Sequence, residues 1–127
     1  MLKKNILIIE PDKILADTYK KVLDNSYFNI QVVATAQEGI LAADAHCPDL
    51  VICELQLVNH GGIEFIYEFR SYKDWQSIPL IIFSSVPPTE FADSQNLMID
   101  QLAVSRYLYK PNTTNLQLIK TVDELLA

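Results

Sequence analysis

Short, almost continuously apolar runs alternate along the chain with longer amphipathic stretches. Apolar runs of this length, bounded by polar residues, predict β-strands, and strands without polar alternation are typical of a sheet covered on both faces. The predicted strands are Ile6–Ile9, Ile30–Ala34, Leu50–Cys53, Leu80–Phe83 and Tyr107–Tyr109. Alternation of such strands with helical stretches indicates consecutive βαβ units, and therefore an α/β protein with a parallel sheet.

The stretches between the strands carry apolar residues at helical spacing. Asp12 and Thr35 are placed to cap the first two helices. The fourth helix is the weakest, because Ser94 within it competes for backbone hydrogen bonds. The predicted helices are Lys13–Asn25, Ala36–His46, Ile63–Tyr72, Thr89–Leu102 and Thr114–Leu126. The inward stripe predicted for the last helix is Leu116, Ile119 and Val122.

Two of the five strands have the character of sheet edges. Gln31 interrupts the second strand, and Arg106 directly precedes the fifth. With these two strands outside and right-handed crossovers, the sheet takes the order 2-1-3-4-5, a doubly wound, flavodoxin-like arrangement of five parallel strands. The chain then reverses direction between the first and third strands, so a functional crevice is expected beyond their carboxyl ends.

Length and charge limit the function classes. The 127 residues suit a single domain over 1–127, and 16 acidic against 10 basic residues give a net charge of −6, which argues against nucleic acid or an anionic membrane as partner. The apolar run Ile6–Ile9 is too short for a signal peptide or a membrane span, so a cytoplasmic protein is expected. Cys47 and Cys53 are interpreted as buried small hydrophobic residues.

Chemically distinctive residues follow the strands. Glu10, Pro11 and Asp12 come directly after the first strand, and Glu54 follows the third. Further along the chain, the fourth strand is followed by Ser84 and Ser85, and the fifth by Lys110 and Pro111. Because the carboxyl ends of parallel strands meet at one edge of a sheet, carboxylates, a hydroxyl and an ammonium are expected to lie together there.

Four segments in this order resemble the receiver domain of two-component response regulators, the CheY-like fold, over essentially the whole chain. They are ILIIEPD, PDLVICELQLVNHGG, IPLIIFSS and SRYLYKP. The resemblance implies that an aspartate after the third strand accepts a phosphoryl group and that acidic residues after the first strand hold Mg²⁺. It also implies that a Ser or Thr and a Lys bind the phosphoryl oxygens, and that an aromatic residue of the fifth strand swings inward as the readout.

Several positions of this chain match that pattern. Glu10 holds the first acidic position, with Asp12 close by in the same acidic segment, and Ser84 and Lys110 hold the phosphate-sensing positions. Tyr107 holds the position of the switch aromatic. A further match is Gly62, eight residues after the phosphoacceptor position.

Other positions depart from the pattern. The phosphoacceptor position is Glu54 rather than Asp, Pro11 replaces the second acidic residue, and Val58 replaces a usual proline. Asp12 is shifted by one residue and is better explained as a helix cap than as a replacement ligand. No metal site or cofactor is therefore expected, because Mg²⁺ needs a nearly complete set of oxygen ligands.

Three interpretations of Glu54 remain open. Its extra methylene extends the carboxylate by about 1.5 Å, so that Glu54 can imitate part of a phosphorylated aspartate. Alternatively, Glu54 forms a purely structural pair with Lys110, or it is itself phosphorylated. A phosphoryl group carries roughly −1.5 to −2 and three acceptor oxygens, whereas a glutamate offers a single negative charge and two oxygens.

These observations predict a stand-alone atypical receiver that signals by binding protein and is not an enzyme. The expected partner is a kinase or output protein on the face formed by Thr89–Leu126, and a homodimer is a further possibility. The alternative is a phosphorylatable, Mg²⁺-dependent receiver of a phosphorelay. A flavodoxin-type electron carrier is disfavoured, because the segment EPDKILAD after the first strand has no glycine to form a phosphate-binding loop.

Overall fold

A computed structural model describes residues 3–57, 61–90 and 96–127. Its sheet has five strands, all paired in parallel, in the order β2-β1-β3-β4-β5. The strands are β1 (Lys4–Ile9), β2 (Phe28–Val33), β3 (Leu50–Cys53), β4 (Leu80–Ser84) and β5 (Arg106–Tyr109). Both the strand order and the edge positions of β2 and β5 confirm the prediction.

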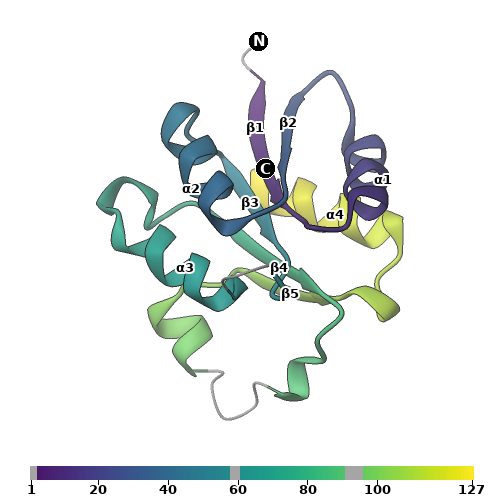
Figure 1. The fold of residues 1–127 in the computed structure, drawn as a ribbon. Helices are drawn as coiled ribbons and strands as arrows, with labels where there is room; N and C mark the ends of the chain where they lie inside the picture. The colour runs from purple at the N-terminus through teal and green to yellow at the C-terminus, as the bar shows by residue number, and fades with distance from the viewer. Residues whose placement is uncertain (1–2, 58–60, 91–95) are drawn as a thin grey trace.

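Helices cover both faces of this sheet. They are α1 (Lys13–Leu23), α2 (Ala36–Ala45), α3 (Gly62–Ser71) and α4 (Asn115–Leu126). Helices α1 and α4 lie on one face, and α2 and α3 lie on the other (Figure 1). Short helical segments of other types are η1 (Lys73–Trp75), η3 (Leu97–Gln101) and η4 (Lys110–Asn112). No helix within the described residues is long and apolar enough to cross a membrane.

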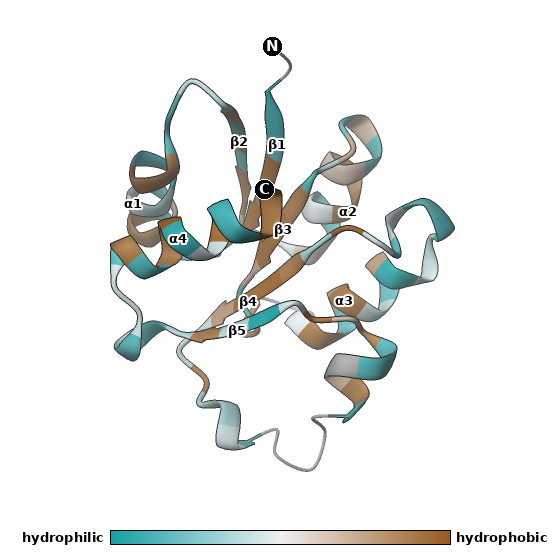
Figure 2. Ribbon diagram, turned by 180° about the vertical axis from the view of Figure 1, so that it is seen from behind, coloured by the Kyte–Doolittle hydropathy of each residue, from teal (hydrophilic) through white to brown (hydrophobic). Residues whose placement is uncertain are grey.

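The apolar side chains form one core on each face of the sheet. Successive residues of β1 alternate between them: Ile6 and Ile8 pack on the side of α1 and α4, and Leu7 and Ile9 pack on the side of α2 and α3. This alternation follows from the two-residue period of a strand. The central strands are accordingly hydrophobic along almost their whole length (Figure 2).

The segment predicted as a helix over Thr89–Leu102 is where the prediction departs most from the structure. Residues 88–90 form a 3₁₀ turn, and Leu97–Gln101 is a π-helix, whereas residues 91–95 lie outside the described part of the chain. Pro88 lacks a backbone donor and Pro87 restricts the residue before it, which favours a tight turn over a regular α-helix at this point.

Two smaller predictions were wrong. Leu116 is 74% exposed, because α4 turns Leu118 and Val122 inward, and a residue two positions before Leu118 lies on the opposite side of a helix. Cys47 is exposed, whereas Cys53 is buried as expected, and burial raises the pKa of its thiol.

A buried arginine fixes the segment that leads into β5. The Arg70 guanidinium, on α3, donates to the backbone carbonyls of Trp75 at 2.6 Å, Leu102 at 2.9 Å and Ala103 at 3.0 Å. Ala103 has a φ of 50°, a conformation that costs energy for a residue other than glycine. The arginine therefore stabilises a strained turn directly before the strand that carries Tyr107.

Candidate functional site

The sheet register brings three predicted side chains to one edge. Ile9 of β1 pairs with Cys53 of β3, so that Glu10 and Glu54, the next residues, leave the sheet side by side. Lys110 follows β5, the strand next to β4. The carboxyl ends of the strands therefore bring together the acidic and basic residues that were expected there.

Lys110 bridges the two glutamates. Its Nζ lies 2.5 Å from Glu10 Oε1 and 2.8 Å from Glu54 Oε1. Only 13% of the Lys110 side chain is exposed, against 3% for Glu10 and 5% for Glu54. The rings of Tyr19 and Phe83 each have their centroids 5.8 Å from this nitrogen. The ammonium is thus enclosed between two carboxylates and two aromatic rings, where water screens the charges weakly.

The second oxygen of each glutamate accepts backbone hydrogen bonds. Glu54 Oε2 accepts from the amides of Leu55 at 2.5 Å and Gln56 at 3.2 Å. Glu10 Oε2 accepts from the amide of Asp12 at 3.2 Å. Each carboxylate is therefore held at both oxygens, one by the lysine and the other by the chain itself.

This network stabilises the ionised forms of Glu54 and Lys110. Burial raises the pKa of Glu54, but hydrogen bonds from Lys110 and Ser84 and the attraction of the lysine charge more than offset it, so the pKa lies below its ordinary value. Burial lowers the pKa of Lys110, and the hydrogen bonds to Glu10 and Glu54 raise it by more, so the pKa lies above its ordinary value. Both pKa shifts favour the charged forms, so Glu54 and Lys110 form an ion pair at neutral pH.

Ser84 and Tyr107 hold the segment after β4 from two sides. The buried Ser84 hydroxyl, which helps to lower the pKa of Glu54, accepts from the Val86 amide at 3.1 Å. The Tyr107 hydroxyl donates to the Val86 carbonyl at 2.6 Å. Burial, followed by the charges of Glu54 and Glu90, raises the pKa of Tyr107 to about 12, so the hydroxyl stays a donor. The backbone of Val86 thus connects the carboxylate site to Tyr107.

Asp12 and Pro11 do not join the charge network. Asp12 Oδ1 accepts from the amides of Ile14 and Leu15, both at 3.0 Å, which makes it the N-cap of α1 as predicted. The proline offers no side-chain oxygen. Within residues 3–57, 61–90 and 96–127, no three His, Cys, Asp or Glu side chains form a group that could hold a metal ion. The lysine ammonium lies between Glu10 and Glu54.

Two contributions to the site were not assigned from the sequence. Tyr19 was not among the predicted site residues, yet its ring borders the lysine. Gly62 was matched only by its spacing, yet a Cβ at this residue would lie 2.5 Å from the Glu54 carbonyl oxygen and 2.6 Å from Leu55 Cα. The start of α3 therefore presses against the backbone that carries Glu54.

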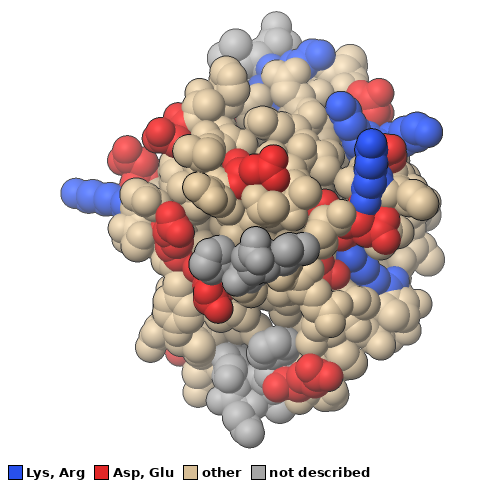
Figure 3. Space-filling view, viewed as in Figure 1, with Lys and Arg blue, Asp and Glu red and all other residues tan. Residues whose placement is uncertain are grey.

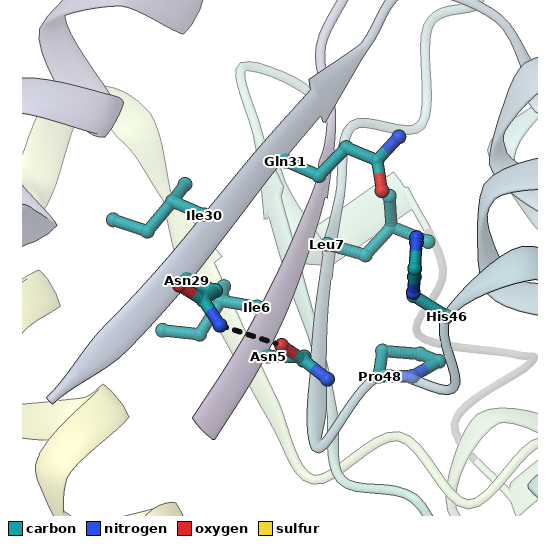
Figure 4. A pocket seen from close by; sticks show the side chains of 8 residues that line it. All are labelled: Asn5, Ile6, Leu7, Asn29, Ile30, Gln31, His46 and Pro48. Atoms are coloured by element: carbon teal, nitrogen blue, oxygen red, sulfur yellow. Dashed lines mark hydrogen bonds between the residues drawn. The ribbon is translucent and has the colours of Figure 1, made fainter. Parts of the chain in front are cut away.

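A separate pocket lies toward the amino ends of the strands. It has a volume of about 260 Å³, and its lining includes Asn5, Asn29, Gln31, His46 and Pro48. The Asn29 side chain donates to Asn5 Oδ1 at 3.3 Å (Figure 4). Asn5 stands near the start of β1 and Glu10 directly after its end, so this pocket is remote from the charge network.

Comparison with known proteins identifies the family. Residues 6–123 match the response regulator receiver domain, and the chain belongs to this family. The KDP operon transcriptional regulatory protein KdpE of Escherichia coli (strain K12) is 29% identical over 107 residues, which cover 84% of this chain and 44% of that protein. The response regulator ArlR of Staphylococcus aureus (strain USA300) is 31% identical over 84 residues, which cover 66% of this chain and 37% of that protein. The chain thus spans less than half the length of these curated relatives.

Solved structures agree on the fold. A sensor protein from Polaromonas sp. JS666 aligns with a TM-score of 0.85 and 22% identity, covering 97% of this chain and 95% of that one. The chemotaxis response regulator CheY4 of Vibrio cholerae aligns with a TM-score of 0.83 and 16% identity, covering 98% and 99%. At these identities the likeness shows a CheY-like fold, and receiver domains of this family are signalling modules.

Proposed function

We propose that this receiver is an atypical one that binds a protein partner without being phosphorylated, with Glu54 in place of a phosphorylated aspartate. The observation that carries the proposal is the contact of 2.8 Å between Glu54 Oε1 and Lys110 Nζ. Lys110 matches the family lysine that binds a phosphoryl oxygen, and here it already binds a carboxylate oxygen. Ser84 also helps to lower the pKa of this carboxylate.

The arrangement of Glu54 disfavours phosphoryl transfer. A carboxylate nucleophile needs an oxygen available for attack, but one oxygen of Glu54 faces Lys110 and the other accepts two backbone amides. Pro11 removes a carboxylate that the family uses for Mg²⁺, and we propose that the chain binds this ion poorly because an incomplete oxygen cage does not displace its waters.

The negative charge of Glu54 supports the proposal that this residue partly imitates a phosphorylated aspartate. A phosphoryl group brings roughly −1.5 to −2, and Glu54 brings a single negative charge close to the lysine. Its longer side chain lets that charge extend beyond the position of an aspartate carboxylate. The site is therefore held in one charge state at neutral pH, and it does not depend on a phosphoryl donor.

The position of Tyr107 supports a connection to the partner face. In the family the aromatic residue of this strand swings inward as the readout, and Tyr107 is half-buried, packs against the core on the side of α2 and α3, and donates to Val86. Because Val86 is also bonded to Ser84, the state of Glu54 can be transmitted to β5. We propose the surface over Thr89–Leu126 as the docking face.

Membership of the receiver family supports a proposal for the partner and for the cellular location. Receiver domains interact with kinases or output proteins, and we propose such a protein as the partner in the cytoplasm, with a second copy of this chain as a further binding mode. The single domain over 1–127 then acts in a two-component-type pathway through binding alone. The phosphorylatable receiver is the alternative function.

Two measurements test the proposal. Incubation of the unmodified chain with acetyl phosphate and Mg²⁺, followed by intact mass spectrometry, should give no phosphorylated species, and clear labelling at Glu54 would favour the phosphorelay alternative. Quantitative capture of partners should then compare the chain with Glu54→Gln and with Asp24→Asn, an exposed control.

The capture experiment separates signalling from stability. Glu54→Gln should lose a partner that the unmodified chain and Asp24→Asn both retain, while circular dichroism shows that the variant is folded. If Glu54→Gln binds the partner normally and only its thermal stability falls, the pair with Lys110 is purely structural and the proposed role of Glu54 is wrong.

A further inference from the structure

A groove lies between α2 and α3, away from the charge network. Its volume is about 550 Å³, and its lining includes Ile40 and Leu41 of α2 and Glu64, Phe65 and Glu68 of α3. Residues four positions apart share one face of a helix, so Glu64 and Glu68 lie in line along one side of the groove. The two helices pack side by side on the same face of the sheet (Figure 1).

The groove has an apolar interior and one exposed apolar side chain, Leu41, on its α2 side. Phe65 is only 1% exposed, and Ile40 is partly buried against the same core. Leu41, in contrast, is 62% exposed. A Cβ at Gly39 would lie 2.9 Å from Ile9 Cδ1 and 3.0 Å from Phe65 Cε1, so the missing side chain lets α2 approach the sheet and α3 closely. Docking a large apolar side chain beside Leu41 would remove this exposed surface from water.

The rim of the groove is acidic. Glu64 and Glu68 are both exposed, and no Lys or Arg is among the residues that line the groove. In Figure 3 acidic side chains lie on both sides of the molecule, whereas most basic side chains lie near α1, away from the side formed by α2 and α3. A partner that fits this surface must carry positive charge next to apolar side chains.

We infer that this groove docks an amphipathic helix of a partner protein, with large apolar side chains on one face and Lys or Arg residues beside them. An apolar groove between two helices is suited to a helix that inserts side chains at positions i, i+3, i+4 and i+7. The acidic rim repels nucleic acid and anionic membranes, and it attracts a basic segment.

A second copy of this chain matches the groove less well. Its α1 exposes Ile14, which is 78% exposed, but the lysines of that helix alternate with Asp17 and are followed by Asp24. The groove is also distinct from the face over Thr89–Leu126, so this inference does not rest on the proposed role of Glu54. The proposed role of Glu54 and the proposed docking in the groove can therefore be disproved independently.

Fluorescence anisotropy with a defined probe tests the inference. The probe is a fluorescein-labelled peptide of leucine and lysine whose leucines form one helical face, and the control peptide has the same composition with its leucines scattered. The groove variants are Leu41→Gln and the pair Glu64→Gln/Glu68→Gln. The matched controls are Ile14→Gln on α1, where the isoleucine is 78% exposed, and the pair Asp17→Asn/Asp24→Asn, both exposed and outside either proposed docking surface.

Each groove variant should weaken binding of the amphipathic peptide by about tenfold, a change of roughly 1.4 kcal/mol, and the control variants should leave it unchanged. The scattered peptide should bind more weakly to the unmodified chain. The inference is wrong if both peptides bind alike, or if the Asp17→Asn/Asp24→Asn pair weakens binding as much as the α3 pair, because the attraction would then come from net charge. It is also wrong if sedimentation shows concentration-dependent self-association that Leu41→Gln abolishes, since the groove would then bind another copy.

Discussion

Lys110 Nζ and Glu54 Oε1 are 2.8 Å apart, which joins the end of β5 to the end of β3 through a buried ion pair. The same nitrogen also bonds Glu10, so that one cation serves two carboxylates. A buried charge that loses its partner is costly, because neither water nor another group compensates it. The stability of this edge of the sheet should therefore depend more on the lysine than on either glutamate.

Replacement of the lysine tests this dependence. Lys110→Met should lower the free energy of unfolding by about 3–5 kcal/mol, because it leaves two neighbouring carboxylates buried without their cation. Glu54→Gln should cost less, since Lys110 keeps Glu10 and the amide oxygen replaces one of the two accepting oxygens, while the amide nitrogen cannot accept the hydrogen bonds of the other. Urea denaturation of both variants measures the difference. Equal losses would show that the lysine is not shared between the two carboxylates in solution.

The pH dependence of stability should report the ionised state of Glu54. A folded pKa below the ordinary 4.5 means that the charge stabilises the fold at pH values above 4.5, and that this contribution is lost as the pH falls through the folded pKa. The stability difference between the unmodified chain and Glu54→Gln should thus be constant near neutrality and shrink only below about pH 4.5. A difference that already disappears above that pH would contradict the lowered pKa.

The lysine should act at the opposite end of the pH scale. The folded pKa of Lys110 lies above the ordinary 10.5, so its contribution is complete below that pH and is lost as the pH rises through the folded value. Urea denaturation across a pH series gives the free energy of unfolding as a function of pH. Titration of Glu54 should lower it at acidic pH, and titration of Lys110 should lower it at alkaline pH.

Two adjacent glycines provide a matched pair for the position of α3. A Cβ at Gly62 would meet backbone atoms at 2.5 and 2.6 Å, whereas a Cβ at Gly61 has only a flexible Glu64 oxygen nearby, at 3.9 Å. Gly62→Ala should therefore cost about 2 kcal/mol or more through overpacking, and Gly61→Ala less than about 1 kcal/mol. Thermal and urea unfolding compare the two variants. Similar losses would mean that α3 does not press against the backbone of Glu54.

The hydroxyl of Tyr107 should contribute a measurable hydrogen bond. Tyr107→Phe removes the donor to the Val86 carbonyl and should cost about 1 kcal/mol in unfolding free energy. Tyr27→Phe is the control, because Tyr27 is 57% exposed. In partner binding, Tyr107→Ala should weaken the interaction if the tyrosine is the readout. Unchanged binding would confine Tyr107 to a structural role.

Strong periodic patterns made the fold predictable from the sequence. The apolar runs of β1, β3 and β4 require cover on both faces, and this requirement, with Gln31 and Arg106 marking the edges, led to the observed strand order. The position of the site followed from that order, because parallel strands bring their carboxyl ends to one edge.

Features that depend on three-dimensional packing were not predictable in the same way. The exposed side of α4 depends on its rotation about its own axis, so Leu116 was placed on the wrong side. The ring of Tyr19 borders Lys110 only because α1 starts next to the site. The sharing of one lysine between Glu10 and Glu54 depends on side-chain reach, which residue spacing does not reveal.

The final prediction concerns the recovery of phosphoryl transfer. Glu54→Asp shortens the side chain and restores the residue type that attacks a phosphoryl donor, but it leaves the metal ligands incomplete. Pro11→Asp supplies a second carboxylate beside Glu10, but it leaves the acceptor position unsuitable. Because a hard oxygen cage and a nucleophile are both needed, only the double variant Pro11→Asp/Glu54→Asp should be labelled by acetyl phosphate in the presence of Mg²⁺.

Intact mass spectrometry of the unmodified chain, both single variants and the double variant measures this recovery, with calorimetric titration of Mg²⁺ alongside. Mg²⁺ should bind clearly only where Asp replaces Pro11, and labelling of the double variant should stop when the ion is chelated. Labelling of Glu54→Asp alone to the same extent would show that Pro11 is no obstacle. A double variant that binds Mg²⁺ but stays unlabelled would place the obstacle elsewhere, in the way Lys110 is held between the two carboxylates.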